Sequence, residues 1–369
     1  MDYAQERITT LHDLTDPTPD APVAESAVVV PIAGETEAAV TPAHVFETLA
    51  AVGPSEVVVP LRAPREVALA FREWASEFAV PVTVLWCDSP PLETLLDDRG
   101  LGGGTGKGRD VWLGLGVAAS RADYVAVHDA DATTYAEKHV PRLLAPLTMG
   151  HEFVKGYYAR VEDDRLYGRL ARLFVAPLLR ALEDRHTDPL LGYLSAFRYP
   201  LAGEFAVTAD AARRIRAQRA WGLELGMLGE TYSVAGETGT AQVDLGIHRH
   251  DHRPVGGRGG LSTMATEVGE ALFRALEDGG VAPNYGTLPD AYRTAADRYI
   301  KQYAADAAFN GLDYDPDGER AQISEYEESI RPPGPDDRLP AWVDAGLAPS
   351  AVVDASRDAL ERRCDSSLD

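Results

Sequence analysis

Two carboxylates one residue apart, Asp129 and Asp131, end the segment YVAVHDADATTY at 124–135. The apolar run before them predicts a buried strand, in which alternate side chains would place both carboxylates on the same face. Like charges that lie together repel, so a positive group should sit between them unless the pair lies in water at a strand end. A divalent cation held by carboxylates and a substrate diphosphate would supply that charge.

The same letters fit a second chemistry. A hydrophobic run followed by Asp-x-Asp-x-Thr also resembles the motif of haloacid dehalogenase-like phosphatases, in which the first aspartate, here Asp129, acts as a nucleophile. That motif normally closes the first strand of its fold, whereas three strand–helix units precede it here. The downstream acidic pair, Asp163 and Asp164, does not follow a clean apolar strand. We therefore rank this alternative second.

Three further features carry charged or metal-binding groups. The loop GGGTGKG places Lys107 at the predicted start of a helix, where a lysine and the helix dipole suit an anion, although a flexible surface loop is the alternative. Glu224 is a lone acid between apolar residues in WGLELG, and such an acid is paired or functional. The segment GIHRHDHRP places His248, His250 and His252 on one strand face. Alternating histidines can bind a metal or a phosphate, and an exposed polar strand end is the alternative.

The elements that would position these residues alternate along the first half of the chain. Strands are predicted at 26–32, 55–61, 80–88 and 124–128, and helices at 41–52, 65–78 and 109–121. Repeated strand–helix units predict a parallel sheet covered on both faces. Ligands bind such sheets beyond the carboxyl ends of the strands, which is where Asp129 and Asp131 lie.

The second half of the chain is mixed and ends in helices. Strands are predicted at 151–160, 203–208 and 240–250, and helices at 166–183, 209–220, 263–277 and 290–309. From about residue 311 the chain is acidic and rich in proline, which predicts a linker that ends in a short helix. We divide the chain into a polar lead-in (1–24), a nucleotide-sugar-binding half (25–160), an acceptor-binding half of the same domain (161–285) and a helical extension with the linker (286–369).

Composition limits the partners. Among 369 residues, 58 are Asp or Glu and 35 are Lys or Arg, so the formal charge of −23 disfavours nucleic acids and anionic membranes as partners. Only four basic residues are lysines, and excess acid with little lysine fits a saline cytoplasm or a GC-rich genome equally well. Two distant cysteines provide no disulfide framework, and the acidic N-terminus lacks the features of a signal peptide, so we expect a cytoplasmic protein.

Taken together, the motifs resemble the GT-A glycosyltransferases, and most closely the glucosyl-3-phosphoglycerate synthase family. The resemblance implies an α/β fold of GT-A type, Rossmann-like and built to bind nucleotide-diphospho-sugars, with a mixed sheet and a C-terminal helical extension. It covers about residues 26–275. The stretches that carry it are VVVPIAGE, GKGRDVWLGL, DYVAVHDAD, FVKGYYAR, PLAGEFA, WGLELGMLGETY and AQVDLGIHRHDHRP.

The resemblance implies a donor site for a nucleoside diphosphate sugar with Mg²⁺ or Mn²⁺. Asp131 and His250 would hold the metal, and a histidine ligand favours Mn²⁺. The 200–204 loop would line the sugar, and the Leu201 carbonyl would lie near the anomeric carbon in a reaction that retains its configuration. Glu224 would bind sugar hydroxyls. The implied donor contacts are Pro31 and Glu35 at the base and ribose, Lys107 at the diphosphate, Asp129 towards the ribose, and Ala130, Asp131, Gly203 and Glu224.

The resemblance also implies a small anionic acceptor, with Arg169, His252 and Arg253 as its contacts. We expect transfer of glucose or mannose to 3-phosphoglycerate, a step towards a compatible solute, by a hexosyltransferase that forms a possible homodimer. Ala171 stands where the family has a threonine and His252 where it has an asparagine, so other phosphorylated or carboxylated acceptors and a lipid phosphate stay open. The second strand ends in PLRAP, without the family's base-binding turn, which leaves the base open.

Overall fold

The computed structural model describes residue 5, residues 7–249 and residues 260–361. The described part of the chain forms a nine-stranded sheet in the order β1-β11-β7-β10-β6-β2-β4-β3, with β5 also paired to β4. β10 runs antiparallel to both of its neighbours, and the other pairs are parallel, so the sheet is mixed as predicted. The strands are β1 (Thr9–Leu11), β2 (Ser26–Val29), β3 (Ile32–Ala33), β4 (Glu56–Arg62), β5 (Val82–Trp86), β6 (Tyr124–Val127), β7 (Phe153–Ala159), β10 (Phe205–Thr208) and β11 (Thr240–Ile247), with a separate hairpin of β8 (Val161–Glu162) and β9 (Arg165–Leu166).

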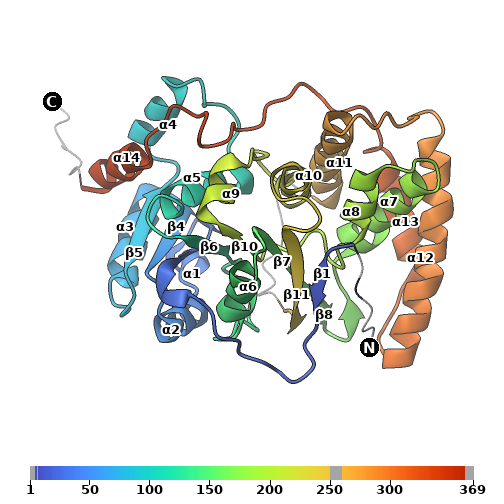
Figure 1. The fold of residues 1–369 in the computed structure, drawn as a ribbon, viewed down its shortest axis with the longest axis horizontal. Coiled ribbons are helices and arrows are strands. Elements are labelled where there is room, and N and C mark those ends of the chain that lie inside the picture. The colour runs from blue at the N-terminus through green and yellow to red at the C-terminus, as the bar shows by residue number, and fades with distance from the viewer. Residues whose placement is uncertain (1–4, 6, 250–259, 362–369) are drawn as a thin grey trace.

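Helices cover both faces of this sheet (Figure 1). Side chains alternate between two cores along each strand, so that Val127 of β6 packs with α5, α9 and α10, and its neighbour Ala126 packs with α2, α3 and α6. The helices of these layers are α1 (Glu37–Val40), α2 (Ala43–Val52), α3 (Arg65–Ala75), α4 (Pro90–Asp97), α5 (Lys107–Ala118), α6 (His139–Thr148), α9 (Ala209–Arg214) and α10 (Leu223–Val234), with the 3-10 turn η1 (Val23–Glu25).

A second group of helices lies beside the β1 edge of the sheet (Figure 1). It comprises the π-helical turn η2 (Leu170–Val175), α7 (Ala176–Glu183), α8 (Pro189–Ser195), α11 (Leu261–Asp278), α12 (Leu288–Asn310) and α13 (Pro316–Glu327). From α13 the chain crosses back to the other side, where α14 (Pro349–Glu361) packs near α4 and β5. No helix among the described residues combines the length and apolar character needed to cross a lipid bilayer.

The crossing segment is anchored to the body of the protein rather than loose. Trp342 stacks on Trp112 of α5 with ring centroids 4.4 Å apart, and the Trp342 indole donates to the Trp112 carbonyl at 2.8 Å. Gly116 makes room for it, since a Cβ there would lie 1.9 Å from the Trp342 ring. The segment predicted as a linker from residue 311 thus packs on the body of the protein and also contains helix α13.

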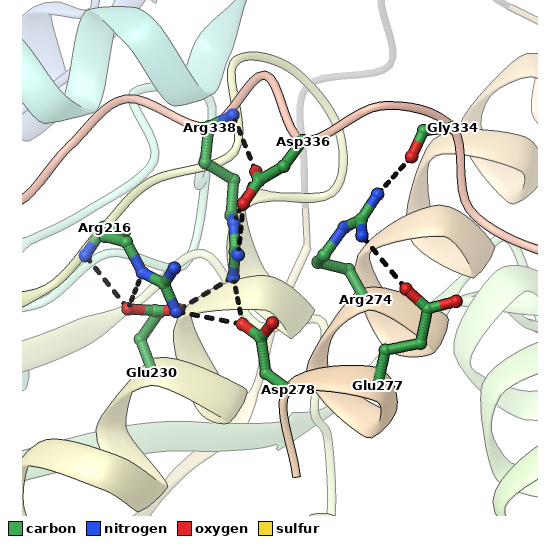
Figure 2. Close-up of polar contacts among 8 residues, drawn as sticks. All are labelled: Arg216, Glu230, Arg274, Glu277, Asp278, Gly334, Asp336 and Arg338. Atoms are coloured by element: carbon green, nitrogen blue, oxygen red, sulfur yellow. Dashed lines mark hydrogen bonds and ion pairs between the residues drawn. The ribbon is translucent and has the colours of Figure 1, made fainter. Parts of the chain in front are cut away.

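A cluster of ionic side chains fastens the same segment to α10 and α11. We call Arg216, Glu230, Asp278, Asp336 and Arg338 the arginine cluster (Figure 2). Its two guanidinium groups bridge carboxylates from three separate parts of the chain at 2.6–3.0 Å. Nearby, Arg274 pairs with Glu277 and also donates to the Gly334 carbonyl, so the segment is held at several points.

Several predicted element boundaries move. The strand predicted at 124–128 ends at Val127, so Asp129 and Asp131 lie in the turn beyond it and not on one strand face. The helix predicted at 209–220 stops at Arg214, because Ala217 pairs with Leu339 instead. The polar lead-in contains β1, which extends the sheet, and Arg142 of α6 binds the segment after β1 through Asp13 and Asp16. The helix predicted at 166–183 begins as the π-helical turn at Leu170.

Candidate active site

Three residues predicted from separate motifs meet beyond the carboxyl end of β6. The Lys107 ammonium lies 2.7 Å from Asp129 Oδ1 and 2.9 Å from Glu224 Oε1. The three side chains are 9–19% exposed, so they lie largely out of water. We call Lys107, Asp129 and Glu224 the lysine cluster. Because one cation serves two carboxylates, an anionic ligand could attract Lys107 away from them, and a further cation could bind the carboxylates in its place.

Two glycines explain how Lys107 reaches Glu224, which is 117 positions away in the chain. Lys107 opens α5 after Gly106, and Gly108 follows it in the first turn. A Cβ at Gly108 would lie 1.9 Å from the Gln218 carbonyl, and one at Gly106 would lie 2.8 Å from Ala220. The 218–220 segment therefore packs directly on the start of α5. Because α10 begins at Leu223, its first turn brings Glu224 to the lysine.

The loop after Tyr199 closes the cluster from another side. Gly203 is buried, and a Cβ there would lie 2.3 Å from Asp129 Oδ2, so only glycine fits against this carboxylate as it stands. Leu201, two residues earlier, is half-buried and packs against the core beneath α10. The PLAGE loop that was predicted to line a sugar thus lies against Asp129, in the same place as the lysine cluster.

The surroundings keep Lys107 charged. Burial by itself would lower its pKa, but the carboxylates of Asp129 and Glu224 outweigh that effect and hold the pKa well above its usual value. A charged lysine at the amino end of α5 also adds to the positive end of the helix dipole. The position therefore suits a phosphate or diphosphate group, which would compete with the two carboxylates for the ammonium.

The segment after Asp129 approaches the end of β11. Asp131 is exposed and Ala130 is half-buried in the turn after β6. Two residues further on, the Thr133 amide donates to the Arg249 carbonyl at 2.8 Å, and the Arg249 amide donates to Thr134 Oγ1 at 3.2 Å. These bonds tie the chain next to Asp131 to the residue that directly precedes His250.

The family resemblance predicts a divalent cation held by Asp131 and His250. Carboxylate and imidazole groups are both ligands that Mn²⁺ accepts, and a carboxylate alone suits Mg²⁺. His250 itself lies outside the described residues. Within the described residues, no set of three or more His, Cys, Asp or Glu side chains forms a metal site.

His248 lies apart from any exposed strand face. β11 ends at Ile247, and His248 is buried beyond it with its ring stacked on Tyr158 at 4.1 Å between centroids. Its Nε2 lies 3.5 Å from Glu204 Oε1 of the PLAGE loop. The other two histidines of the predicted alignment, His250 and His252, lie outside the described residues.

The residues predicted for the nucleotide base lie at the neighbouring strand ends. Pro31 is half-buried between β2 and β3, whereas Glu35 is exposed just before α1. Pro31 follows β2, which pairs with β6, whereas Glu35 follows β3, which pairs with β4. Neither side chain forms a hydrogen bond or ion pair with the lysine cluster within the described part of the chain.

Arg169 is the predicted acceptor contact that lies among the described residues. Arg169 is exposed at the start of η2 and lowers the pKa of the buried Tyr326 phenol, although burial raises that pKa more strongly. Gly168, at φ 72°, lies against the Tyr199 hydroxyl, where a Cβ would be 2.6 Å away. This contact joins the arginine to the PLAGE loop. The other two predicted contacts, His252 and Arg253, lie outside the described residues.

A cavity of about 210 Å³ lies behind this loop. Its wall includes Arg198, Tyr199 and Pro200 from the loop and Arg172 from η2. Arg172 forms a buried ion pair with Glu319 of α13 at 2.7 Å and stacks on Tyr303, so its charge is already compensated. We interpret Arg172 as a fastening between η2 and α13.

One charged residue of the site was missed from the sequence. Lys155 of β7 is 1% exposed, and its ammonium has no hydrogen-bond partner among the described residues. The strand FVKGYYA contains one of only four lysines in the chain, in an otherwise apolar or aromatic run. A lone lysine in a buried strand was the available signal, since such residues are rarely buried without a purpose.

The phosphatase alternative lacks its second acidic motif. Asp163 and Asp164 form the exposed turn between β8 and β9, with left-handed φ angles of 46° and 56°. They lie in the separate β8–β9 hairpin and do not follow a strand of the main sheet. Asp129 also follows β6 near the centre of the sheet, after β2, β4 and β5.

Comparisons with known proteins agree with the GT-A resemblance. No protein-family model matches the chain. It is 33% identical to glucosyl-3-phosphoglycerate synthase of Methanococcoides burtonii, over 99% of this chain and 97% of that protein. It is 37% identical to glucosyl-3-phosphoglycerate synthase of Persephonella marina, over 73% of this chain and 71% of that protein.

Solved structures support the fold. The chain superposes with a TM-score of 0.53 on a crystal structure of glucosyl-3-phosphoglycerate synthase from Mycobacterium tuberculosis, at 22% identity over 76% of this chain and 90% of that one. That structure is a complex with Mn²⁺, UDP-glucose and phosphoglyceric acid. A second structure of the enzyme, with Mg²⁺ and UDP, gives a TM-score of 0.52 at 24% identity over 75% of this chain and 88% of that one. The likeness at this identity establishes a shared fold.

Proposed function

The chain belongs to the glucosyl-3-phosphoglycerate synthase family of glycosyltransferases, and from this premise we propose that it transfers glucose from UDP-glucose to 3-phosphoglycerate. The observation that carries the proposal is the lysine cluster, which joins three separate donor-site motifs at one strand end. The two relatives named glucosyl-3-phosphoglycerate synthase support 3-phosphoglycerate as the acceptor. The complex of the mycobacterial enzyme with UDP-glucose and phosphoglyceric acid supports this pair of substrates.

The residues of the donor site would act by charge. Lys107 would leave its carboxylates to bind the diphosphate, and Asp129, next to Gly203, would face the ribose. Glu224 would accept hydrogen bonds from sugar hydroxyls. Because negative charge grows on the leaving diphosphate, an ammonium bound to it would stabilise the transition state more than the ground state. Pro31, Glu35 and Ala130 would border the base and ribose.

A divalent cation, Mn²⁺ or Mg²⁺, completes the donor site in this proposal. Asp131 and His250 would hold it, and hydrogen bonds join residues 133–134, shortly after Asp131, to Arg249, the residue before His250. When bound, the metal supplies Lewis-acid stabilisation of the departing diphosphate. A histidine ligand favours Mn²⁺ over Mg²⁺.

We further propose that the reaction retains the anomeric configuration. The Leu201 carbonyl would lie near the anomeric carbon. It belongs to the loop in which Gly203 packs against Asp129. No carboxylate nucleophile is then required, because the acceptor hydroxyl attacks from the face that the diphosphate leaves. Mannose stays the alternative sugar. An NMR spectrum of the product would report the configuration directly.

The acceptor would be held by positive charge on an otherwise acidic protein. Arg169, Arg253 and His252 are the proposed contacts, and the packing of Gly168 on Tyr199 supports a link between Arg169 and the sugar loop. A guanidinium suits the carboxylate and phosphate of 3-phosphoglycerate, since it can bind either with two parallel hydrogen bonds. Ala171 and His252 depart from the family, so glycerol phosphates, other phosphorylated acids and lipid phosphates belong in the acceptor panel.

Thermal stability with nucleotide sugars tests the donor proposal. A ligand at about 100 times its Kd should stabilise the fold by about 2.7 kcal/mol. We expect Mn²⁺ with UDP-glucose to raise the melting temperature of the wild type but not of Asp131→Ala, and UDP to be released on addition of 3-phosphoglycerate. A panel of ADP-, GDP- and UDP-sugars, with glucose and mannose, would fix the donor. Absence of any shift with every nucleotide sugar would refute the proposal.

Assembly and location complete the proposal. The family resemblance implies a homodimer, and we propose a cytoplasmic location. The excess of acid with little lysine fits a saline cytoplasm or a GC-rich genome equally well, so activity should be compared in low and high KCl. Phe309, near the end of α12, is 90% exposed and is the kind of side chain that a partner would cover. Sedimentation of the wild type and of Phe309→Ser would separate a dimer through α12 from a monomer.

A further inference from the structure

Lys155 is a buried cation that the proposed donor contacts leave without a role. It lies in the middle of β7 with 1% of its surface exposed, and its ammonium has no hydrogen-bond partner among the described residues. Its ammonium lies over the ring of Phe205, with Nζ 5.7 Å from the ring centroid. Burying an unpaired ammonium costs stability, so a lysine in this state calls for a functional reason.

The sheet register points Lys155 towards the lysine cluster. Lys155 pairs with Phe205 of the antiparallel strand β10, so both side chains lie on the same face. Phe205 belongs to the core that packs with α5 and α10, the helices that carry Lys107 and Glu224. The charged groups that act on Lys155 are Glu224, Glu204, Lys107 and Asp129, and burial lowers its pKa to about 8.

The lysine cluster contains one positive charge for two negative ones. If Lys107 turns to the diphosphate of the donor, Glu224 loses the ammonium that now lies 2.9 Å from it. The Glu224 side chain is 9% exposed, so water cannot replace that partner at little cost. A second cation behind the site would remove this penalty without blocking the sugar.

We propose that Lys155 is a positioning residue that holds the Glu224 carboxylate when Lys107 binds the donor diphosphate. The proposal rests on the proposed transferase function. In it, Lys107 moves between two sets of anions, the Lys155 backbone stays in β7 while its flexible side chain turns to Glu224, and Glu224 keeps its orientation towards the sugar. Lys155 itself touches neither substrate.

Binding measurements on Lys155→Met test the idea. Titration calorimetry with UDP-glucose and Mn²⁺ should show a Kd about tenfold weaker than in the wild type, because the bound state leaves Glu224 without a cation. In turnover, KM for UDP-glucose should rise about tenfold while KM for 3-phosphoglycerate stays within twofold. The melting temperature without ligand should equal or exceed that of the wild type, since an unpaired buried charge has been removed. Lys301→Met, at an exposed position of α12, is the matched control and should change none of these values.

A double-mutant cycle shows whether Lys155 acts through Glu224. In a Glu224→Gln background, Lys155→Met should weaken UDP-glucose binding less than twofold. Equal losses in both backgrounds, or an Lys155→Met protein that binds like the wild type, would overturn the proposal. If Lys155→Met does not fold, Lys155→Gln takes its place, with the same results expected for UDP-glucose binding and for the double-mutant cycle. A wild type that binds no nucleotide sugar would instead refute the proposed function and this inference with it.

Discussion

Helix α10 carries two glutamates that take part in ionic clusters of different kinds. Glu224 belongs to the lysine cluster and Glu230, six positions later, to the arginine cluster. Each cluster has one more carboxylate than it has cations. The lysine cluster is mostly out of water, with side chains 9–19% exposed, whereas Arg216, Asp278 and Asp336 of the arginine cluster are 40–43% exposed.

The two types of cation explain what each cluster can do. A guanidinium presents several donors in a fixed fork, so Arg216 and Arg338 saturate their carboxylates and lock three segments together (Figure 2). An ammonium is a compact charge on a flexible stem, so Lys107 can turn from a carboxylate to a phosphate. The comparison predicts that disturbing the lysine cluster changes activity, and that disturbing the arginine cluster changes stability.

The largest effect is expected from Glu224→Gln. The variant keeps the shape of the side chain but removes the charge that Lys107 and the sugar hydroxyls would share. We expect kcat/KM to fall at least 100-fold, a loss of about 2.7 kcal/mol in transition-state stabilisation, which is typical for one preorganised polar group. Steady-state kinetics would measure kcat/KM, and a thermal melt would show whether the variant keeps the stability of the wild type. Activity within threefold of the wild type would remove Glu224 from the site.

Glu230→Gln should give the opposite result on the same helix. It removes one of the two carboxylates that Arg216 and the 6% exposed Arg338 share, and leaves Asp278 as the other. Breaking a buried pair costs about 3–5 kcal/mol, and the partial exposure of Arg216 reduces our expectation to about 2–3 kcal/mol. Urea unfolding should show this loss, while activity per folded molecule stays within twofold. Asp184→Asn, in the exposed pair with Arg180, is the control and should cost less than about 0.5 kcal/mol. A drop in activity without a loss of stability would contradict the division between the clusters.

Gly203→Ala should disturb the lysine cluster indirectly. The added methyl would lie 2.3 Å from Asp129 Oδ2, so the carboxylate must turn away from Lys107. Because the end of a side chain moves and not the backbone, we expect little loss of stability and about a tenfold loss of kcat/KM, or about 1.4 kcal/mol. Gly334→Ala, where a methyl meets no atom within 4 Å, should leave activity unchanged. Equal activity of the two variants would show that Asp129 need not stay in place.

Local patterns predicted most of what lies around the site. Apolar runs identified β2, β4, β5 and β6, and the glycine-rich loop identified the start of α5 at Lys107, because these features depend on neighbours in the chain. The joining of Lys107 to Glu224 depends on the contact of Gly108 with the Gln218 carbonyl, across 110 positions. The motifs did not encode that contact, and only the family resemblance suggested a common site.

The errors lie where distant contacts overrule composition. An acidic, proline-rich stretch predicted a linker, yet the stacking of Trp342 on Trp112 and the arginine cluster fasten it to the core. His248 was predicted to share a strand face with His250 and His252, but β11 stops at Ile247 and the His248 ring is buried on Tyr158. Lys155 was passed over because nothing in its neighbourhood along the chain shows that its ammonium lacks a partner.

The smallest effect concerns acid stability in the arginine cluster. Hydrogen bonds from Arg338 lower the pKa of Asp336 from 3.8 to about 2. A carboxylate with a depressed folded pKa stabilises the fold above its unfolded pKa and loses that contribution as pH falls towards the folded value. Asp336→Asn should therefore cost about 0.5 kcal/mol at pH 7, a figure kept low because the side chain is 43% exposed.

The difference between Asp336→Asn and the wild type should shrink as pH falls from about 4 towards about 2, because both proteins then carry a neutral side chain at this position. Urea midpoints at pH 7, 5, 4 and 3 would follow it, with kcat/KM at pH 7 unchanged. A difference that stays constant from pH 7 to pH 3 would show that the side chain contributes shape and hydrogen bonds rather than charge. In that case the arginine cluster would stabilise the fold through packing and hydrogen bonds rather than through charge. It would then differ from the lysine cluster in the geometry of its side chains and not in the strength of its ion pairs.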